Sequence, residues 1–168
     1  MVKKENKQER IIIPCTRFYQ NDTMMFTGTI KLSQLVELNT EVDQFRAKDI
    51  NKPELGYQRA PEPRRAKKFG EYISQGETSP TSILLSIRDE DTETNAEVIE
   101  FPSETKDGIV IRDSDHVEVS IDPKCLVYVV DGQHRLTGIE NCDVYGKLAN
   151  FAIPFTLFAI FPEWMQSL

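Results

Sequence analysis

The chain has 168 residues, of which 39% are hydrophobic and 28% are charged, a balance typical of one globular domain. Its formal net charge of −7 excludes an overall basic surface for DNA, because nonspecific DNA affinity comes largely from Lys and Arg contacts to phosphates. A local basic patch is still compatible with this average. No run of about 18 apolar residues predicts a membrane span, and the polar start lacks the apolar core of a signal peptide. We therefore expect a cytoplasmic protein without a membrane partner.

The cysteines and histidines give little support for a disulfide framework or a zinc site. Cys15, Cys125 and Cys142 form no C-x-x-C pair, and an odd number of widely spaced cysteines is typical of small buried side chains. The two histidines, His116 and His134, are far apart in the sequence. We expect no structural metal, and any metal should be Mg²⁺ carried with a nucleoside triphosphate.

Near the start of the chain, a β-branched run predicts a strand over residues 10–16, and residues 26–30 are predicted to be either its partner strand or an extended segment. Ser33 is a candidate N-cap for a short helix that buries Leu35 and Leu38. We expect this helix to continue into the polar segment 39–53.

A second helix is predicted over residues 63–76, because Pro63 suits the first helical turn. Its apolar residues recur at helical spacing and should face the core; they are Ala66, Phe69 and Ile73. Arg64, Lys67, Lys68 and Glu71 lie on the opposite side. The basic run has two interpretations, a solvated helix face or a contact surface for a polyanion.

From residue 81 onward the pattern is typical of a sheet. Strands are predicted over residues 82–88, 96–101, 108–112, 116–120 and 126–130, with a hairpin tip over 89–95. The middle three alternate polar and apolar residues, as half-exposed antiparallel strands do, and the last is apolar throughout, which indicates the centre of the sheet. A further strand is predicted over 151–161 and the first turn of a helix over 162–165. These elements predict an α+β domain with a mixed or mostly antiparallel sheet and flanking helices.

The most informative stretch is Asp131-Gly132-Gln133-His134-Arg135, which follows a buried strand and precedes a helix expected over 135–148. Gly132 would let the backbone approach a ligand, and the amides of the first helical turn carry partial positive charge. Gln133 and Arg135 add donors for a phosphate, while Asp131 and His134 are candidate catalytic groups. Gly138 would permit close packing of this helix against the strand. An ordinary structural turn is the competing interpretation.

The motif Asp131-Gly132-Gln133-His134-Arg135-Leu136, followed by Gly138-Ile139, resembles the signature of the DGQHR-domain family, which includes the DndB proteins of bacterial DNA phosphorothioation islands. The step Tyr57-Gln58-Arg59 and the strand over 151–161 are similar to other elements of that family. The resemblance begins near Phe26, so we expect a tail with its first strand (1–25) and a DGQHR domain (26–168). Because relatives are longer by the same resemblance, we expect this domain to be incomplete at its C-terminus.

This resemblance implies a ParB or sulfiredoxin-like fold and a role in bacterial DNA modification or phage defence, with other DNA-modification proteins as partners. It implies that Arg59, Gly132, Gln133 and Arg135 bind nucleotide phosphates. Arg64, Arg65, Lys67 and Lys68 are candidate DNA contacts, of which Arg65 is placed near the motif by the resemblance. His134 stands where phage-defence relatives that hydrolyse nucleotides have Gln.

Three functions follow from these residues. The chain is a Mg²⁺-dependent nucleoside triphosphatase that uses Asp131 and His134, or a DndB-like module that binds DNA through backbone contacts. In the third, the motif only organises the fold, with Asp131 or Arg135 in an internal ion pair. The sequence does not distinguish them, and it leaves the oligomeric state open.

Overall fold

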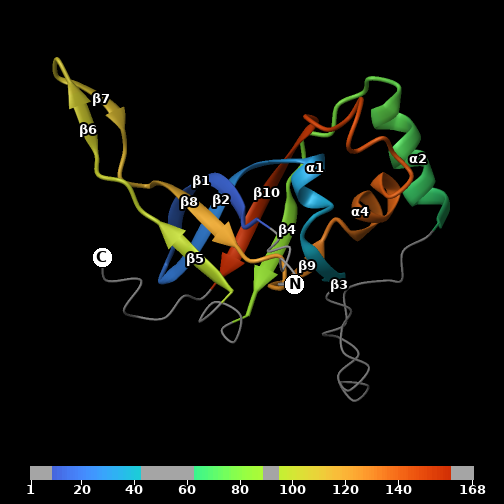
Figure 1. Cartoon of the computed structure of the whole chain (residues 1–168), viewed down its shortest axis with the longest axis horizontal. Coiled ribbons are helices and arrows are strands. Elements are labelled where there is room, and N and C mark those ends of the chain that lie inside the picture. Colours follow the sequence, from blue (N-terminus) through green and yellow to red (C-terminus); the bar gives the residue numbers. More distant parts are fainter. Residues whose placement is uncertain (1–8, 43–62, 89–94, 160–168) are drawn as a thin grey trace, which may run out of the picture.

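The computed structural model describes residues 9–42, 63–88 and 95–159. In these ranges a main sheet contains eight strands, namely β1 (Ile11–Gln20), β2 (Thr23–Lys31), β3 (Asn39–Val42), β4 (Ile83–Ile87), β5 (Ala96–Ile99), β8 (His116–Ile121), β9 (Leu126–Asp131) and β10 (Ala152–Ala159). A separate hairpin of β6 (Glu104–Lys106) and β7 (Ile109–Arg112) projects from the body (Figure 1). The helices are α1 (Leu32–Leu35), α2 (Pro63–Ser74) and α4 (Gln133–Ile139).

The strand order of the main sheet is β3-β9-β4-β10-β2-β1-β8-β5. The pairs β3/β9 and β4/β10 are parallel, and the other neighbours are antiparallel. The predicted fold class is confirmed at this level, as a mixed, mostly antiparallel sheet with few helices.

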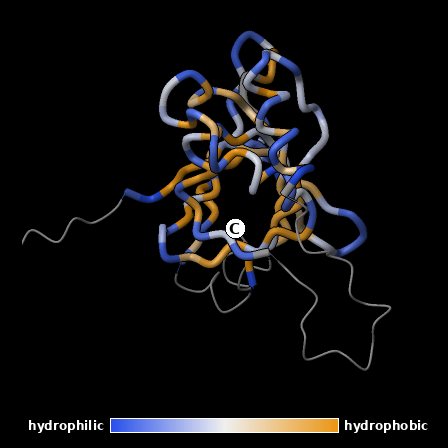
Figure 2. The backbone as a smooth tube through the Cα atoms, turned by 90° about the vertical axis from the view of Figure 1, so that its right-hand side faces the viewer, coloured by the Kyte–Doolittle hydropathy of each residue, from blue (hydrophilic) through white to orange (hydrophobic). Residues whose placement is uncertain are grey.

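The core lies on the inner face of this sheet, because alternate residues of each strand point to the same side. Phe26, Ile30, Ile83, Ile153 and Phe155 are all at most 2% exposed. The strands curve around this common hydrophobic interior (Figure 2). Helices α2 and α4 pack side by side at one end of the molecule (Figure 1).

The strand predictions are confirmed in type, with two corrections in position. The strand predicted for the sheet centre, β9, lies second from the edge, because β3 pairs with its outer side. Its exposure accordingly alternates, with Val127 and Val129 buried. Among the described residues, strand β7 lies outside the main sheet and pairs with β6, a strand that was not predicted.

The helix predictions need three corrections. Helix α1 begins at Leu32 with Lys31 as its N-cap, so Ser33 lies inside it. The expected continuation into 39–53 is wrong at its start, because Asn39–Val42 forms β3 against β9. Helix α4 ends at Ile139 instead of Leu148. Beyond it, the Asp143 carboxylate accepts a hydrogen bond from the Lys147 amide, a local bond that competes with helix.

Helix α2 is confirmed, with Ala66 and Ile73 buried and Phe69 half-buried. The hairpin tip at 89–94 and the helical turn expected over 162–165 fall outside the described residues. The division of the chain at residue 25 stays a prediction. Along the described ranges, no helix is both long and apolar enough to cross a membrane.

Candidate functional site

Gly132 is the residue at which the backbone turns from β9 into α4. It has a φ of +104°, in the left-handed region that residues with side chains rarely adopt. A Cβ atom at this position would lie 2.7 Å from Cγ2 of Ile83 on β4, well inside van der Waals contact. The turn therefore requires glycine for its backbone conformation and for its close packing against β4.

Arg135 of α4 donates hydrogen bonds to the two residues that immediately precede β4. Its Nη1 donates hydrogen bonds to the carbonyl oxygen of Thr81 and, at 3.1 Å, to the Thr81 hydroxyl; its Nη2 donates to the Ser82 carbonyl at 3.0 Å. Burial lowers the pKa of the Arg135 guanidinium, and the nearby Asp131 carboxylate opposes this shift. The partners are carbonyl and hydroxyl oxygens, not the internal acid that the third interpretation required. Phosphate binding by Arg135 stays a prediction.

The other motif side chains lie in different environments. Asp131 is exposed, whereas Gln133 is only 5% exposed. His134 is half-buried, and its Nε2 atom is buried with no hydrogen-bond partner in the part of the chain that the structure describes. The structure thus places Asp131 near Arg135 and puts Gln133 in the interior. The catalytic roles of Asp131 and His134, and phosphate binding by Gly132 and Gln133, stay predictions.

The first turn of α4 has few amides left for an anion. The helix has seven residues, and the amides of Arg135 and Leu136 donate to the Gly132 carbonyl at 3.0 and 3.2 Å. The expected cradle of several free amides is therefore reduced to the first residues of the helix.

Helix α2 carries the four candidate DNA contacts, and all four are exposed; they are Arg64, Arg65, Lys67 and Lys68. Arg64 and Lys68 lie opposite the side of the helix that buries Ala66 and Ile73, and Arg65 and Lys67 flank that buried side. The remaining candidate cation, Arg59, lies outside the described residues.

Two glycines bring α2 and α4 into close contact. A Cβ atom on Gly138 would lie 2.2 Å from the Ala66 carbonyl oxygen, and one on Gly70 would lie 2.5 Å from the Gly138 carbonyl oxygen. Gly138 thus permits close packing, as predicted, but its neighbour is α2 and not the strand. The crossing joins the basic helix directly to the motif helix.

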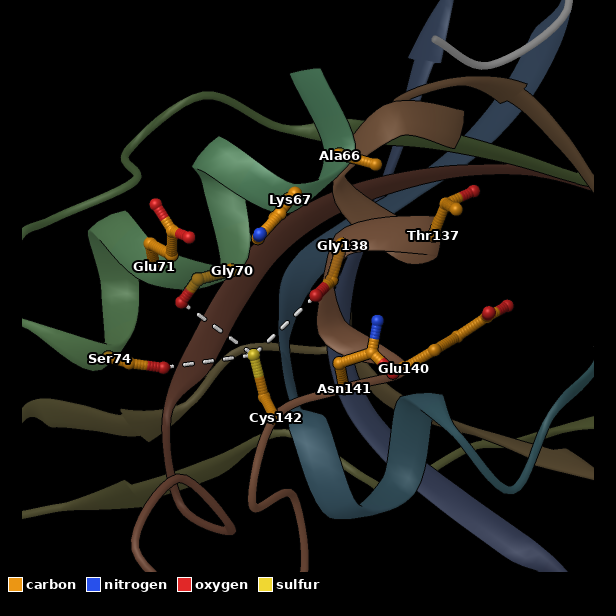
Figure 3. Close-up of a pocket in the computed structure, with 10 residues that line it drawn as sticks. All are labelled: Ala66, Lys67, Gly70, Glu71, Ser74, Thr137, Gly138, Glu140, Asn141 and Cys142. Atoms are coloured by element: carbon orange, nitrogen blue, oxygen red, sulfur yellow. Dashed lines mark hydrogen bonds between the residues drawn. The ribbon is translucent and has the colours of Figure 1, made fainter. Parts of the chain in front are cut away.

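A pocket of about 560 Å³ lies in the groove between α2 and α4 (Figure 3). Its floor includes Ala66, Gly70 and Gly138, and the Cys142 thiol lies 3.7 and 3.5 Å from the carbonyl oxygens of the two glycines. The polar residues around it are Lys67, Glu71, Ser74, Thr137, Glu140 and Asn141.

Sequence reasoning missed most of the residues that line this pocket. The available signal was a glycine within each of two helical segments, Gly70 and Gly138, since glycine inside a helix usually marks a close approach of backbones. Ser74, Thr137 and Asn141 belong to no motif and are brought together only by the crossing.

Metal binding has no preformed cluster at this site. Within residues 9–42, 63–88 and 95–159, no three His, Cys, Asp or Glu side chains are grouped so as to hold a metal ion. Coordination by Asp131 of a Mg²⁺ ion carried with a nucleotide stays a prediction.

We expect Gly132→Ala to lower the free energy of unfolding by about 2–5 kcal/mol. The left-handed conformation costs a residue with a side chain about 1–2 kcal/mol, and overpacking against Ile83 adds about 1–3 kcal/mol. Urea unfolding measures the loss. Gly76→Ala is the matched control, because Gly76 has a φ of +93° but no atom within 4 Å of its added Cβ. Equal losses in the two variants would contradict the packing role.

We expect Arg135→Ala to lower the free energy of unfolding by about 2–3 kcal/mol, since hydrogen bonds from a charged donor contribute about 1.5–3 kcal/mol. The same urea titration applies. Arg64→Ala removes an exposed guanidinium on α2 and should not lower the free energy of unfolding by more than about 0.5 kcal/mol. Unaltered stability of Arg135→Ala would show that the bonds to Thr81 and Ser82 do not secure the fold.

Comparison with known proteins identifies the family. Residues 13–161 match the family model DndB, described as DNA-sulfur modification-associated. No curated protein and no solved structure matched the chain. The match covers most of the chain and confirms the resemblance drawn from the motif. The chain therefore belongs to the DndB family of DNA-sulfur modification-associated proteins.

Proposed function

We propose that this protein serves a bacterial DNA phosphorothioation system, or its control, by binding the DNA backbone through the basic face of α2. We define that face as Arg64, Arg65, Lys67 and Lys68. The family match supports the association with DNA-sulfur modification. The exposure of four cations on one helix, in a chain of net charge −7, is the observation that carries the DNA contact.

The position of these cations within α2 supports a binding role. Arg64 and Arg65 lie in the first turn, which has no acidic residue. The N-terminal end of a helix already carries partial positive charge, so cations there are unfavourable for the helix itself. The same arrangement concentrates positive potential where a phosphate would be attracted. Cations in the first turn of a helix, where acidic residues would stabilise it, are typical of a surface that is kept for function.

The motif turn supports α2 in this proposal. Arg135 and Gly132 secure the junction of β4, β9 and α4, and the Gly70–Gly138 crossing fixes α2 on α4. The same proposal includes the binding of nucleotide phosphates by a set of motif and upstream residues, namely Arg59, Gly132, Gln133 and Arg135. It also includes a ParB-like relationship of the fold, association with other DNA-modification proteins and a cytoplasmic location.

The double variant Arg64→Ala/Lys68→Ala should weaken binding to duplex DNA and reduce the salt dependence. Each lost phosphate contact lowers the slope of log K against log [salt] by about 0.9, so two contacts lower it by about 2. Fluorescence anisotropy across a salt series measures both quantities.

The matched control is Lys106→Ala/Lys124→Ala, which removes the same two charges from exposed positions outside α2. It should retain the wild-type slope. If both double variants lose affinity equally, overall charge and not the face of α2 governs binding.

Nucleotide hydrolysis is the second candidate function. The exposed Asp131 carboxylate favours it, because it offers a group in the motif turn that could place Mg²⁺ or orient a water molecule. With ATP, GTP or CTP and Mg²⁺, this candidate predicts phosphate release that falls at least about tenfold in Asp131→Asn. Glu97→Gln on β5, also exposed, should retain the wild-type rate. Phosphate release that is equal in wild type and Asp131→Asn would exclude this role.

A further inference from the structure

The pocket between α2 and α4 has the size and lining of a small-molecule site. Its volume of about 560 Å³ falls within the range of about 300–1,000 Å³ typical of such sites. Three of its residues, Ala66, Gly70 and Gly138, have at most one side-chain carbon and are buried. They let the two helix backbones meet closely, and the pocket lies in the groove beside this contact, with these residues as an apolar part of its floor.

The polar lining offers both donors and acceptors. Asn141 has an amide, Ser74 and Thr137 have hydroxyl groups, and Figure 3 shows Lys67 and Asn141 on different sides of the pocket. Glu71 and Glu140 are exposed carboxylates at its edge. Asparagine and carboxylate side chains are those that pair with the amino-bearing edges of adenine and cytosine.

The charges around the pocket decide which part of a ligand enters it. One cation, Lys67, is opposed by two anions, Glu71 and Glu140, so the lining favours groups that donate hydrogen bonds over a phosphate. The cations Arg64 and Lys68 lie on the same helix, at positions three before and one after Lys67. A phosphate is therefore favoured on the basic face, and an uncharged ring with amino groups is favoured in the pocket.

We propose that this pocket binds a nucleobase that bears an exocyclic amino group, while the attached phosphate lies on the basic face of α2. The inference rests on the proposed function, which supplies the phosphate contact. The nucleobase belongs to a free nucleotide or to an unpaired position in DNA, two sources with the same chemistry.

Matched nucleotide pairs test the proposal, because cytidine and uridine 5′-monophosphate, and adenosine and inosine 5′-monophosphate, differ at the amino group. Protein-observed NMR titration of the full chain gives the dissociation constants, with ribose 5-phosphate as the ligand that lacks a base. We expect the amino-bearing member of each pair to bind about five- to tenfold more tightly, the effect of one or two specific hydrogen bonds.

The double variant Glu71→Gln/Glu140→Gln should bring the ratio within each pair close to one, because it removes the charged acceptors. Glu97→Gln should preserve the ratio. Duplex DNA with a single unpaired cytosine or uracil, measured against fully paired duplex, separates the two sources. A preference for the unpaired cytosine shows that DNA supplies the base, and a preference confined to the mononucleotides shows a free nucleotide.

The results of these titrations distinguish a nucleobase site in the pocket from DNA binding by the basic face of α2. Equal binding of every nucleotide and of ribose 5-phosphate, with no preference at the unpaired position, overturns the nucleobase site even when paired DNA binds normally. A base preference in a chain that does not bind paired DNA supports the pocket and contradicts the proposed DNA contact. A preference that persists unchanged in Glu71→Gln/Glu140→Gln also overturns the proposed site.

Discussion

The close crossing of α2 and α4 is the constraint on which the rest of the site depends. A side-chain carbon on Gly138 would lie 2.2 Å from the Ala66 carbonyl oxygen, so neither helix can keep its position without glycine there. The crossing places the exposed cations of α2 beside the helix that carries the motif. It also leaves the pocket of about 560 Å³, because the small residues at the contact do not fill the groove beside it. One packing constraint thus determines both the basic face and the pocket.

The motif residues Gly132 and Arg135 attach the crossed helices α2 and α4 to the sheet. Gly132 allows β9 to turn into α4 directly over Ile83, and Arg135 binds the two residues before β4. These contacts join β4 to the consecutive elements β9 and α4, which come much later in the sequence. A short polar motif at a strand-to-helix junction can therefore be specific to a family for structural reasons as well as for ligand binding. Three hydrogen bonds from the Arg135 guanidinium already go to Thr81 and Ser82, so this side chain has a structural role whether or not its other N–H groups contact a phosphate.

The sequence predicts the helices and strands that have a clear hydrophobic period. It does not predict elements whose secondary structure depends on pairing with a strand that is distant in the sequence. The strands β4, β8 and β10 and the buried side of α2 follow from alternation and helical spacing. The segment Asn39–Val42 has no strong period and becomes a strand because β9 offers it a partner. The pocket was not predictable, because Ser74 and Asn141 are 67 positions apart and meet only through the crossing. The motif residues join β9 to α4, and the directions of their side chains depend on β4.

In helix α2, burial of apolar side chains offsets the loss of stability caused by the cations in its first turn. Its first turn carries Arg64 and Arg65 and no acid, and each cation near a helix N-terminus costs about 0.3–1 kcal/mol through the helix dipole. Gly70 within the helix costs about 1 kcal/mol more relative to Ala. An isolated 12-residue helix of this composition would be marginal. Burial of Ile73 and Ala66 compensates, since one fully buried aliphatic side chain of the size of Ile contributes about 1.5–3 kcal/mol. The basic face can therefore exist because its helix is stabilised from the opposite side, where Gly138 of α4 brings the two backbones together.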